Sequence, residues 1–462
     1  MIPEDIPMTA EQAFGIDLHG ERLTSAIFRL AVPLVGERIS QTVISIISAL
    51  LVGRFVGSDG LAAVGIAGLL FWLPLSGAWG VSIGGTVLTA HDTGARASED
   101  LRRAIHATVT SAFTWGLVTT LLFVAAAQPL MQLMAAEGDV LSMGVDYIRI
   151  SAVGIPFMAL MFAVNGCLRG MGDTRTPMLI IVVCDVISAV LAVALISGAG
   201  GLPEMGAVGA GLAYTGGGIA GGLLAISVLA LRRGPIRFEP FRAFAFRGRD
   251  LRRLLNIAIP AGLEELQFSL AFLVYSRIIT GLGTAATAAH TVSLRVLEIA
   301  MVPGFALGTA GTAIVGQSLG AGLPALAERA GREVQKWAVL TMVVLGIVTA
   351  LTAPWIVSAF VDDQEVVDVG TACLRVFALA FPMMGTGVAL SGALRGAGDV
   401  RYVLAVITFS AWAVRIPFAF LFSHVIPWGA PGAWLGAVME HNVRGGLVWL
   451  RFRGGRWKTK RL

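Results

Sequence analysis

Apolar stretches of about 20 residues recur along the whole chain, and they limit the folds that it can adopt. A helix of about 20 apolar residues crosses a hydrocarbon core of roughly 30 Å. Only 14% of the 462 residues are charged, whereas soluble domains carry about 25%. The sequence therefore predicts an all-α integral membrane protein. We expect twelve transmembrane helices at 27–52, 61–90, 106–133, 141–168, 177–198, 207–231, 254–280, 284–316, 337–360, 366–394, 402–426 and 430–450.

One motif occurs twice in the chain. Leu168–Arg175 reads Leu-Arg-Gly-Met-Gly-Asp-Thr-Arg, and Leu394–Arg401 reads Leu-Arg-Gly-Ala-Gly-Asp-Val-Arg, 226 residues later. Glu37 similarly returns as Glu264, four residues after a proline in both copies. Solenoid repeats are only about 20–50 residues long, so this spacing indicates a duplicated half of the protein. Six expected spans separate the copies, so we expect two pseudo-symmetric six-helix lobes, a parallel repeat with its axis along the membrane normal and a cavity between the lobes.

Charged residues alternate along the connections between the expected helices. Connections after even-numbered spans are rich in arginine, above all the one at 232–253, and those after odd-numbered spans carry acids such as Asp59 and Glu204. Basic connections stay in the cytoplasm, so we expect a multi-pass protein of the cell inner (cytoplasmic) membrane with both termini cytoplasmic. The expected organisation is a cytosolic tail at 1–26, an N-lobe at 27–231, a basic cytoplasmic linker at 232–253, a C-lobe at 254–450 and a basic cytosolic tail at 451–462.

The charge distribution also excludes some partners and cofactors. The net charge of +5 comes from basic residues spread over short connections, which differs from the clustered patch of a nucleic-acid module. The sequence lacks a nucleotide-binding loop and zinc-ligand spacing, and its three cysteines stand apart in apolar stretches. We therefore expect a monomer that meets the lipid bilayer, with no nucleic acid, no cofactor and no metal.

Acidic residues inside the expected spans are the first candidates for a functional site. An intramembrane carboxylate is costly and is functional by default, because away from water it can exchange a proton or bind a cation. Glu37 in the first span and Glu264 in the seventh are such residues. Helical spacing places Gln41 and Ser48 on the face of Glu37, and Tyr275 on the face of Glu264. The alternative is that each glutamate joins helices through a buried hydrogen bond or ion pair.

Two more acids in the spans, Asp185 and Glu265, are also candidates for ion coupling or substrate binding. Asp185 in the fifth span is a further candidate for ion coupling, with helix packing as the alternative. Glu265 points about 100° away from its neighbour Glu264 and is expected to contact another helix.

Three charged positions are expected to be structural. Glu298 lies one turn after Arg295, and Glu440 lies one turn before Arg444, so each glutamate has a partner on its own helix. Arg415, in the middle of the eleventh span, needs a carboxylate partner that the sequence does not identify.

Several short motifs are spread in order over nearly the whole chain. They are Val52-Gly53-Arg54, Tyr147-Ile148-Arg149-Ile150 with Gly154-Ile155-Pro156, Leu168-Arg169-Gly170, Ala288-Ala289-His290, and Val315-Gly316-Gln317 with Leu319-Gly320-Ala321. Together they resemble the multidrug and toxic compound extrusion (MATE) family. The resemblance implies a secondary antiporter that exports small-molecule, amphipathic organic cations in exchange for protons or sodium ions by alternating access, without enzymatic activity.

The chain departs from the family pattern at positions that bear on coupling. Ser48 stands where many members carry an aspartate, and Ser188 and Ala192 stand where many carry an asparagine and an aspartate. An acid common in the tenth span is also replaced, by the run 383–385. Coupling is therefore expected to depend on Glu264 alone or on an acid of the first half that has taken over the task.

The duplicated motif itself is expected to be a structural or gating joint. Its glycines suit a tight turn, and Asp173 and Asp399 can each cap the next helix. Arg169 and Arg395 are expected to anchor these turns to the cytoplasmic face.

Two rival functions remain open from the sequence. A flippase for a lipid-linked precursor would use a basic cavity, for which Arg38 and Arg415 are candidates. A membrane-embedded transferase would use the acidic run 362–368 as a metal–diphosphate site, although a solvated loop explains that run as well.

Overall fold

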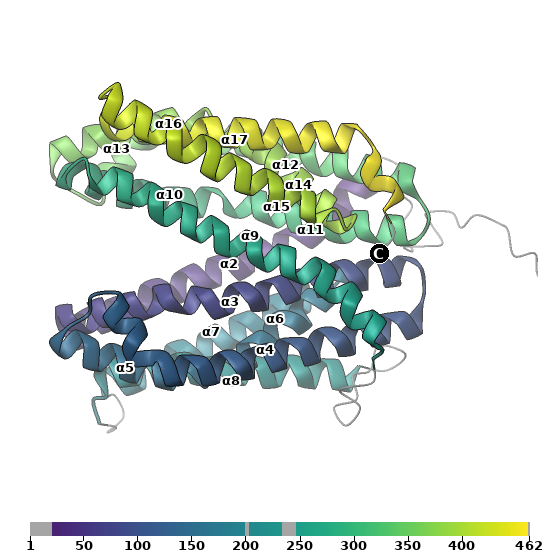
Figure 1. Ribbon diagram of the computed structural model, residues 1–462, viewed down its shortest axis with the longest axis horizontal. Helices are drawn as coiled ribbons and strands as arrows, with labels where there is room; N and C mark the ends of the chain where they lie inside the picture. The colour runs from purple at the N-terminus through teal and green to yellow at the C-terminus, as the bar shows by residue number, and fades with distance from the viewer. Residues whose placement is uncertain (1–20, 199–202, 233–245, 461–462) are drawn as a thin grey trace, which may run out of the picture. The chain divides into compact units, whose positions relative to one another are not determined.

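The computed structural model describes residues 21–198, 203–232 and 246–460, and within them every element is helical (Figure 1). The elements of the first half are α2 (Glu21–Phe55), α3 (Gly57–Gly94), α4 (Ser98–Leu133), α5 (Gly138–Ala152), α6 (Ile155–Gly170), α7 (Arg175–Ile196) and α8 (Gly206–Leu231). Those of the second half are α9 (Gly248–Thr280), α10 (Thr284–Ala300), α11 (Val302–Gly320), α12 (Pro324–Ser358), α13 (Gln364–Ala378), α14 (Phe381–Gly396), α15 (Val400–Phe409), η3 (Ser410–Arg415), α16 (Ile416–Phe420), η4 (Leu421–Val425), α17 (Gly429–Arg453) and η5 (Arg456–Thr459). The prediction of an all-α protein is confirmed.

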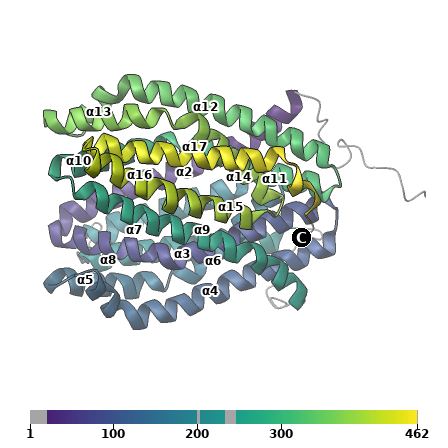
Figure 2. The same cartoon turned by 45° about the horizontal axis from the view of Figure 1, so that its top comes forward.

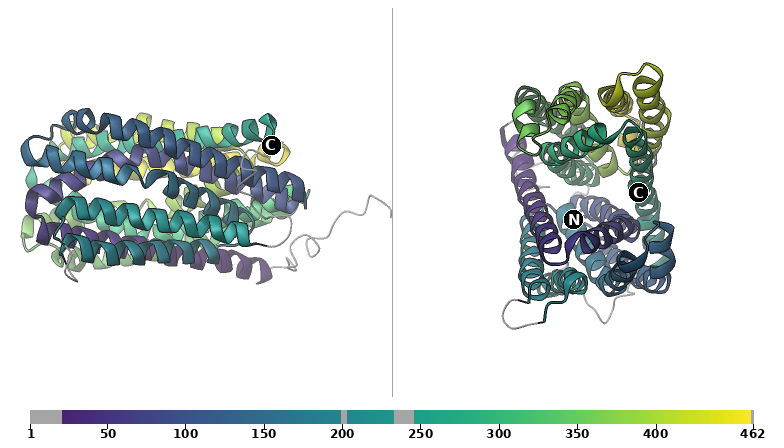
Figure 3. Two further views of the ribbon diagram at one scale, coloured as in Figure 1. Left: turned by 90° about the horizontal axis from the view of Figure 1, so that it is seen from below. Right: turned by 90° about the vertical axis from the view of Figure 1, so that its left-hand side faces the viewer.

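The chain divides into two compact units. The amino-terminal unit is Pro33–Leu263, and the carboxy-terminal unit is Glu264–Leu462 together with the part of α2 that precedes Pro33. Within the first unit α3, α4 and α6 pack on one another and α7 packs along α8. Figure 3 shows the helices of this half, coloured from dark blue to teal, lying side by side. Within the second unit α12, α13 and α17 lie side by side (Figure 2).

Long apolar helices account for most of the expected spans. Among the residues that the structure describes, eight helices are long and apolar enough to cross a membrane, and three bent pairs bring the number to as many as eleven. The pairs are α5 with α6, α10 with α11 and α13 with α14, bent by 49°, 42° and 55°. In each pair a proline opens the second helix, where its missing N–H leaves no hydrogen bond unmade. The twelfth expected span corresponds to α17, which carries several charged side chains.

The same hydrogen bond between two helices occurs in both halves of the chain. Thr86 of α3 donates a hydrogen bond to the carbonyl of Gly166 in α6 at 3.0 Å, and Thr312 of α11 donates to the carbonyl of Gly392 in α14 at 2.9 Å. A Cβ on either glycine would lie 2.4 Å or less from a backbone oxygen of the facing helix. The two helix pairs therefore pack backbone to backbone, as small residues permit in membrane bundles.

The turns after the repeated motif follow the prediction in part. Gly172 and Gly398 have φ values of 88° and 78°, which favour glycine. Asp173 accepts a hydrogen bond from the Thr176 backbone N–H at 3.0 Å and so caps α7. The expected cap by Asp399 is wrong, since α15 has no side-chain cap bond.

Asp399 instead forms ion pairs. Its carboxylate accepts from Arg451 at 2.8 Å and from Lys460 at 2.5 Å. Asp173 is similarly paired with Arg232, just after α8. In each unit the motif aspartate therefore binds a basic residue at or beyond the end of the unit's last long helix.

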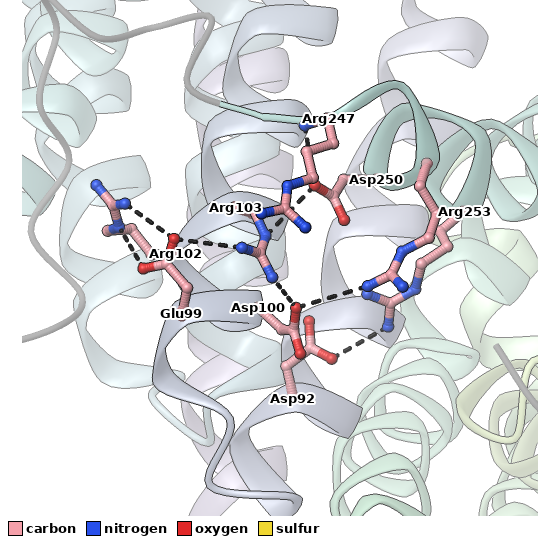
Figure 4. Close-up of polar contacts among 9 residues, drawn as sticks. Asp92, Glu99, Asp100, Arg102, Arg103, Arg247, Asp250 and Arg253 are labelled. Atoms are coloured by element: carbon pink, nitrogen blue, oxygen red, sulfur yellow. Dashed lines mark hydrogen bonds and ion pairs between the residues drawn. The ribbon is translucent and has the colours of Figure 1, made fainter.

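The first part of α9 is bound to α3 and α4 by a cluster of charges (Figure 4). Arg253 donates to Asp92 at 3.1 Å, and Asp250 lies 3.5 Å from Arg103. Asp250 also accepts from the backbone N–H of Arg247 at 3.0 Å, which caps the start of the helix. This cluster lies wholly in the amino-terminal unit.

Candidate functional site

A buried ion pair joins α2 to α6 in the amino-terminal unit. Arg169 donates to both carboxylate oxygens of Glu37, at 2.6 and 2.7 Å, and both side chains are buried. An ion pair in this environment is favourable only with close geometry and further hydrogen bonds.

The corresponding pair joins α9 to α14 in the carboxy-terminal unit. Arg395 bonds Glu264 through two of its nitrogens, one to each carboxylate oxygen, with Nε to Oε2 at 3.3 Å. The neighbouring Glu265 is half-buried and acts on Arg395 electrostatically. The two elements that repeat in the sequence, the glutamate and the motif arginine, therefore meet in both units.

This finding corrects the role expected for the motif arginines. Arg169 and Arg395 were expected to anchor turns at the cytoplasmic face, but their guanidinium groups bind buried glutamates instead. The ion pairs also mean that neither Glu37 nor Glu264 is an unpaired carboxylate. They agree with the alternative in which each glutamate joins two helices, and they are compatible with a role in cation exchange.

Asp185 lies close to the Glu37 pair. Its carboxylate accepts a hydrogen bond from the hydroxyl of Ser40 at 2.6 Å, and the Glu37 carboxylate is near enough to act on it electrostatically. Within the described residues no lysine or arginine forms an ion pair with Asp185. In the described part of this unit, Asp185 is therefore a half-buried acid held by a hydroxyl and by no ion pair.

The remaining polar candidates on the α2 and α9 faces have other surroundings. Gln41 is half-buried and accepts from Arg38 at 3.3 Å, and Ser48 is half-buried. Tyr275 is buried, with the Arg415 guanidinium 5.5 Å from its ring centre. Glu298 is exposed and forms the predicted pair with Arg295, at 3.1 Å.

A second buried charge centre lies in the carboxy-terminal unit, around Glu440 of α17. Arg415 donates to Glu440 at 2.7 Å, Ser410 donates at 3.2 Å, Arg444 lies at 3.9 Å and His441 at 3.5 Å. We call these five residues the Glu440 centre. The carboxylate partner that the sequence left unidentified for Arg415 is therefore Glu440, which also keeps its predicted neighbour Arg444.

The backbone around Arg415 explains how this contact forms. Ser410–Arg415 is a π-helical segment within the span, and such segments rotate the following side chains and often occur at functional sites. Sequence periodicity assumes an α-helix throughout, so it could not place Arg415 against Glu440.

Aromatic rings adjoin the Glu440 centre. Arg415 lies 5.6 Å from the ring centre of Phe268. Tyr275 packs edge-on to His290 at 5.7 Å, and His290 packs edge-on to Trp434 at 5.6 Å. In the other unit Arg38 lies 5.5 Å from the ring centre of Trp79.

The acidic run that suggested a transferase is explained by local structure. Asp363 accepts from the Glu365 backbone N–H at 2.9 Å and caps α13, and Asp368 accepts from Gln364 at 2.9 Å. In the described part of the chain no group of three or more His, Cys, Asp or Glu side chains could hold a metal ion.

Comparison with known proteins identifies the family to which this architecture belongs. The family model MatE matches the chain twice, at residues 33–194 and 260–421. A probable multidrug resistance protein NorM of Bradyrhizobium diazoefficiens is 30% identical, with 92% of each chain covered. The probable multidrug resistance protein YoeA of Bacillus subtilis is 28% identical, with 88% of each chain covered.

Solved structures agree on the fold. A MATE transporter in complex with MaL6 has a TM-score of 0.88 at 24% identity, covering 95% of this chain and 98% of that one. An outward-facing MATE family multidrug resistance transporter also has a TM-score of 0.88, covering 95% and 97%.

The fold, the duplication and the family match thus define a membrane transporter made of two pseudo-symmetric helical lobes. The chain belongs to the multidrug and toxic compound extrusion (MATE) family, which transports solutes and is not enzymatic.

Proposed function

We propose that this transporter exports amphipathic organic cations in exchange for protons or sodium ions by alternating access. We further propose that it acts as a monomer in the cytoplasmic membrane with both termini in the cytoplasm. Membership of the MATE family and relatives named as multidrug resistance proteins support drug export. They favour it over the flippase and the transferase.

The observation that carries the proposal is the buried glutamate–arginine pair present in both units. Removing one partner of such a pair leaves a buried charge uncompensated, at a cost of about 3–5 kcal/mol. Glu37 and Glu264 can therefore release their arginines only when another positive charge replaces them. A proton, a sodium ion and an organic cation can each supply that charge, which makes the pairs suited to exchange.

Asp185 supplies the second acid of the amino-terminal unit in this mechanism. A carboxylate held by the Ser40 hydroxyl can take up a proton without first displacing a guanidinium. Proton binding at Asp185 would reduce the repulsion that it exerts on Glu37. We therefore assign Asp185 to proton uptake and Glu37 and Glu264 to exchange with the organic cation.

Everted membrane vesicles and a fluorescent organic cation test the proposal. Proton and sodium gradients are imposed separately, and uptake is compared for wild type, Glu37→Gln, Glu264→Gln and Asp185→Asn. Glu298→Gln is the matched control, because its pair with Arg295 is exposed. We expect uptake to follow one of the two gradients and to fail in Glu37→Gln and Glu264→Gln. Uptake by wild type that ignores both gradients would overturn the proposal.

A further inference from the structure

The Glu440 centre has more positive than negative charge in contact. One carboxylate faces the two guanidinium groups of Arg415 and Arg444, and all three side chains are buried. Both oxygens of Glu264 are occupied by Arg395, on which Glu265 also acts, so the second guanidinium group of the centre has no close carboxylate of its own. A buried guanidinium group without a close carboxylate is costly, so this centre favours a further negative group.

The hydrogen bonds of the region indicate the same missing partner. Among the described residues, five buried atoms here have no hydrogen-bond partner: Arg415 Nε, Arg444 Nε, Trp434 Nε1, Tyr275 Oη and His290 Nδ1. The first three can only donate and the tyrosine hydroxyl can also donate, whereas His290 Nδ1 donates or accepts according to its tautomer. Both oxygens of Glu440 already have polar neighbours. Buried donors are normally satisfied, so what is lacking is an acceptor.

The rest of the fold does not require this centre. When the starts of α8 and α17 are aligned, at Gly206-Ala207 and Gly429-Ala430, Gly217 corresponds to Glu440 and Gly221 to Arg444. A Cβ at Gly217 would lie 1.7 Å from the Ser188 hydroxyl, so the amino-terminal unit fills this place with close helix packing. The helix α7 also remains α-helical over Arg175–Ile196, without a π segment.

We propose that the Glu440 centre binds a monovalent anionic group, either the carboxylate of an exported zwitterionic molecule or a free halide ion. Arg415 and Arg444 supply the charge, and the aromatic rings of Phe268, Tyr275 and Trp434 suit a carboxylate carried on an aromatic body. The first source rests on the proposed export function, and the second does not.

A binding measurement on the purified protein tests the site independently of transport. The melting temperature is measured in detergent and sulfate buffer with benzoate, with uncharged benzyl alcohol, or with chloride. Wild type is compared with Arg444→Gln, which leaves Glu440 its nearest partner Arg415, and with Arg444→Lys, which keeps the charge. Arg277→Gln is the control, because Arg277 is exposed and contacts Thr280.

We expect benzoate, but not benzyl alcohol, to raise the melting temperature of wild type and Arg277→Gln. Arg444→Gln should need at least tenfold more benzoate for the same rise, and Arg444→Lys should respond like wild type or nearly so. A response to chloride at lower concentration than to benzoate assigns the site to a free halide. The absence of stabilisation by either anion, or equal stabilisation of Arg444→Gln, overturns the proposal.

A transport measurement then separates the two sources. Proteoliposomes are supplied with an aromatic zwitterion that has a free carboxylate, or with its methyl ester. If the carboxylate of the exported molecule is the ligand, Arg444→Gln raises the KM for the zwitterion about tenfold and leaves the KM for the ester unchanged. An equal increase for both compounds contradicts a carboxylate site. Failure of wild type to transport either compound would contradict the proposed function, while the binding result would still stand.

Discussion

The two units share one buried ion pair and differ in the charges placed beside it. Glu37–Arg169 and Glu264–Arg395 occupy equivalent positions. The amino-terminal unit adds a lone acid, Asp185, whereas the carboxy-terminal unit adds the Glu440 centre with its surplus of arginine. The glutamate–arginine pair is thus common to both units, so we infer that it serves a function that both units share. Asp185 and the Glu440 centre each occur in one unit only, so we infer that they serve functions in which the units differ.

The helices around these charged residues also differ between the two units. The amino-terminal unit packs the glycine-rich α8 closely against α7, which leaves little room for polar side chains. The carboxy-terminal unit replaces the α7 equivalent by α-helical and π-helical segments and places charged residues on α17. The two units thus share a duplicated set of helices, and the Glu440 centre lies where the carboxy-terminal unit departs from regular α-helix.

The strongest test of this difference removes one carboxylate from each unit. Glu440→Gln leaves two buried guanidinium groups facing each other, whereas Glu37→Gln leaves one unpaired. We expect losses in the free energy of unfolding of about 5 and about 3 kcal/mol, respectively, because breaking a buried pair costs about 3–5 kcal/mol. Chemical denaturation in detergent micelles measures both values, with Glu298→Gln as the exposed control. Equal losses in Glu440→Gln and Glu37→Gln would mean that the second arginine of the Glu440 centre adds nothing to the cost of removing the carboxylate.

A double substitution separates the structural role of the shared pair from its transport role. Replacing Glu37 and Arg169 together by glutamine removes both charges, so most of the stability lost in Glu37→Gln should return, to within about 1–2 kcal/mol of wild type. Coupled transport should remain absent, because the exchangeable charge is gone. The same result is expected for Glu264 and Arg395. Recovery of gradient-driven transport in either double variant would show that its pair is only a helix contact.

Asp185→Asn should affect coupling far more than stability. It weakens one hydrogen bond with Ser40, which is worth about 1 kcal/mol. We expect the dependence of transport on the proton gradient to disappear while substrate binding persists. Ser40→Ala is the matched control, since it removes the same hydrogen bond and keeps the carboxylate. If both variants lose proton dependence equally, Asp185 acts by positioning α2 and not by carrying the proton.

Much of this architecture follows from sequence alone, because its determinants are periodic or duplicated. Apolar length predicts the spans, and the 226-residue spacing predicts the repeat that the family model also matches. Buried acids such as Glu37 and Glu264 are found because a carboxylate within an apolar run is costly. These signals can be identified along the chain without knowing which helices are neighbours.

The pairing of charges could not be predicted in the same way. Glu37 and Arg169 lie 132 residues apart, and only the fold brings α2 against α6. The motif arginines also looked like surface anchors because the rule for basic connections describes loops and not side chains that point back into the bundle. The π-helical segment Ser410–Arg415 could not be predicted either, since an extra residue in a helical turn does not change the amino-acid composition in a recognisable way.

The smallest expected effect concerns the turn after the repeated motif, where Asp173 and Asp399 differ. Burial alone would raise the pKa of Asp173, but hydrogen bonds from the Thr176 backbone and hydroxyl and the ion pair with Arg232 lower it below its ordinary value. A lowered pKa in the folded state stabilises the protein at any pH above the unfolded value, near 3.9. That contribution is lost as the pH falls through the folded pKa.

Asp173→Asn should therefore reduce the melting temperature slightly at pH 7, and the difference from wild type should shrink as the pH falls below about 4 and vanish below the folded pKa. Thermal unfolding of both proteins across this range measures the effect, with Thr176→Val to isolate the hydroxyl bond. Asp399→Asn should behave differently, because its carboxylate contacts two basic side chains and does not cap a helix. Salt should reduce the loss in Asp399→Asn less than it reduces the loss in Asp173→Asn, since the Asp399 carboxylate is buried whereas both partners of the Asp173–Arg232 pair are partly exposed to screening ions. A larger salt response in Asp399→Asn than in Asp173→Asn would contradict this difference.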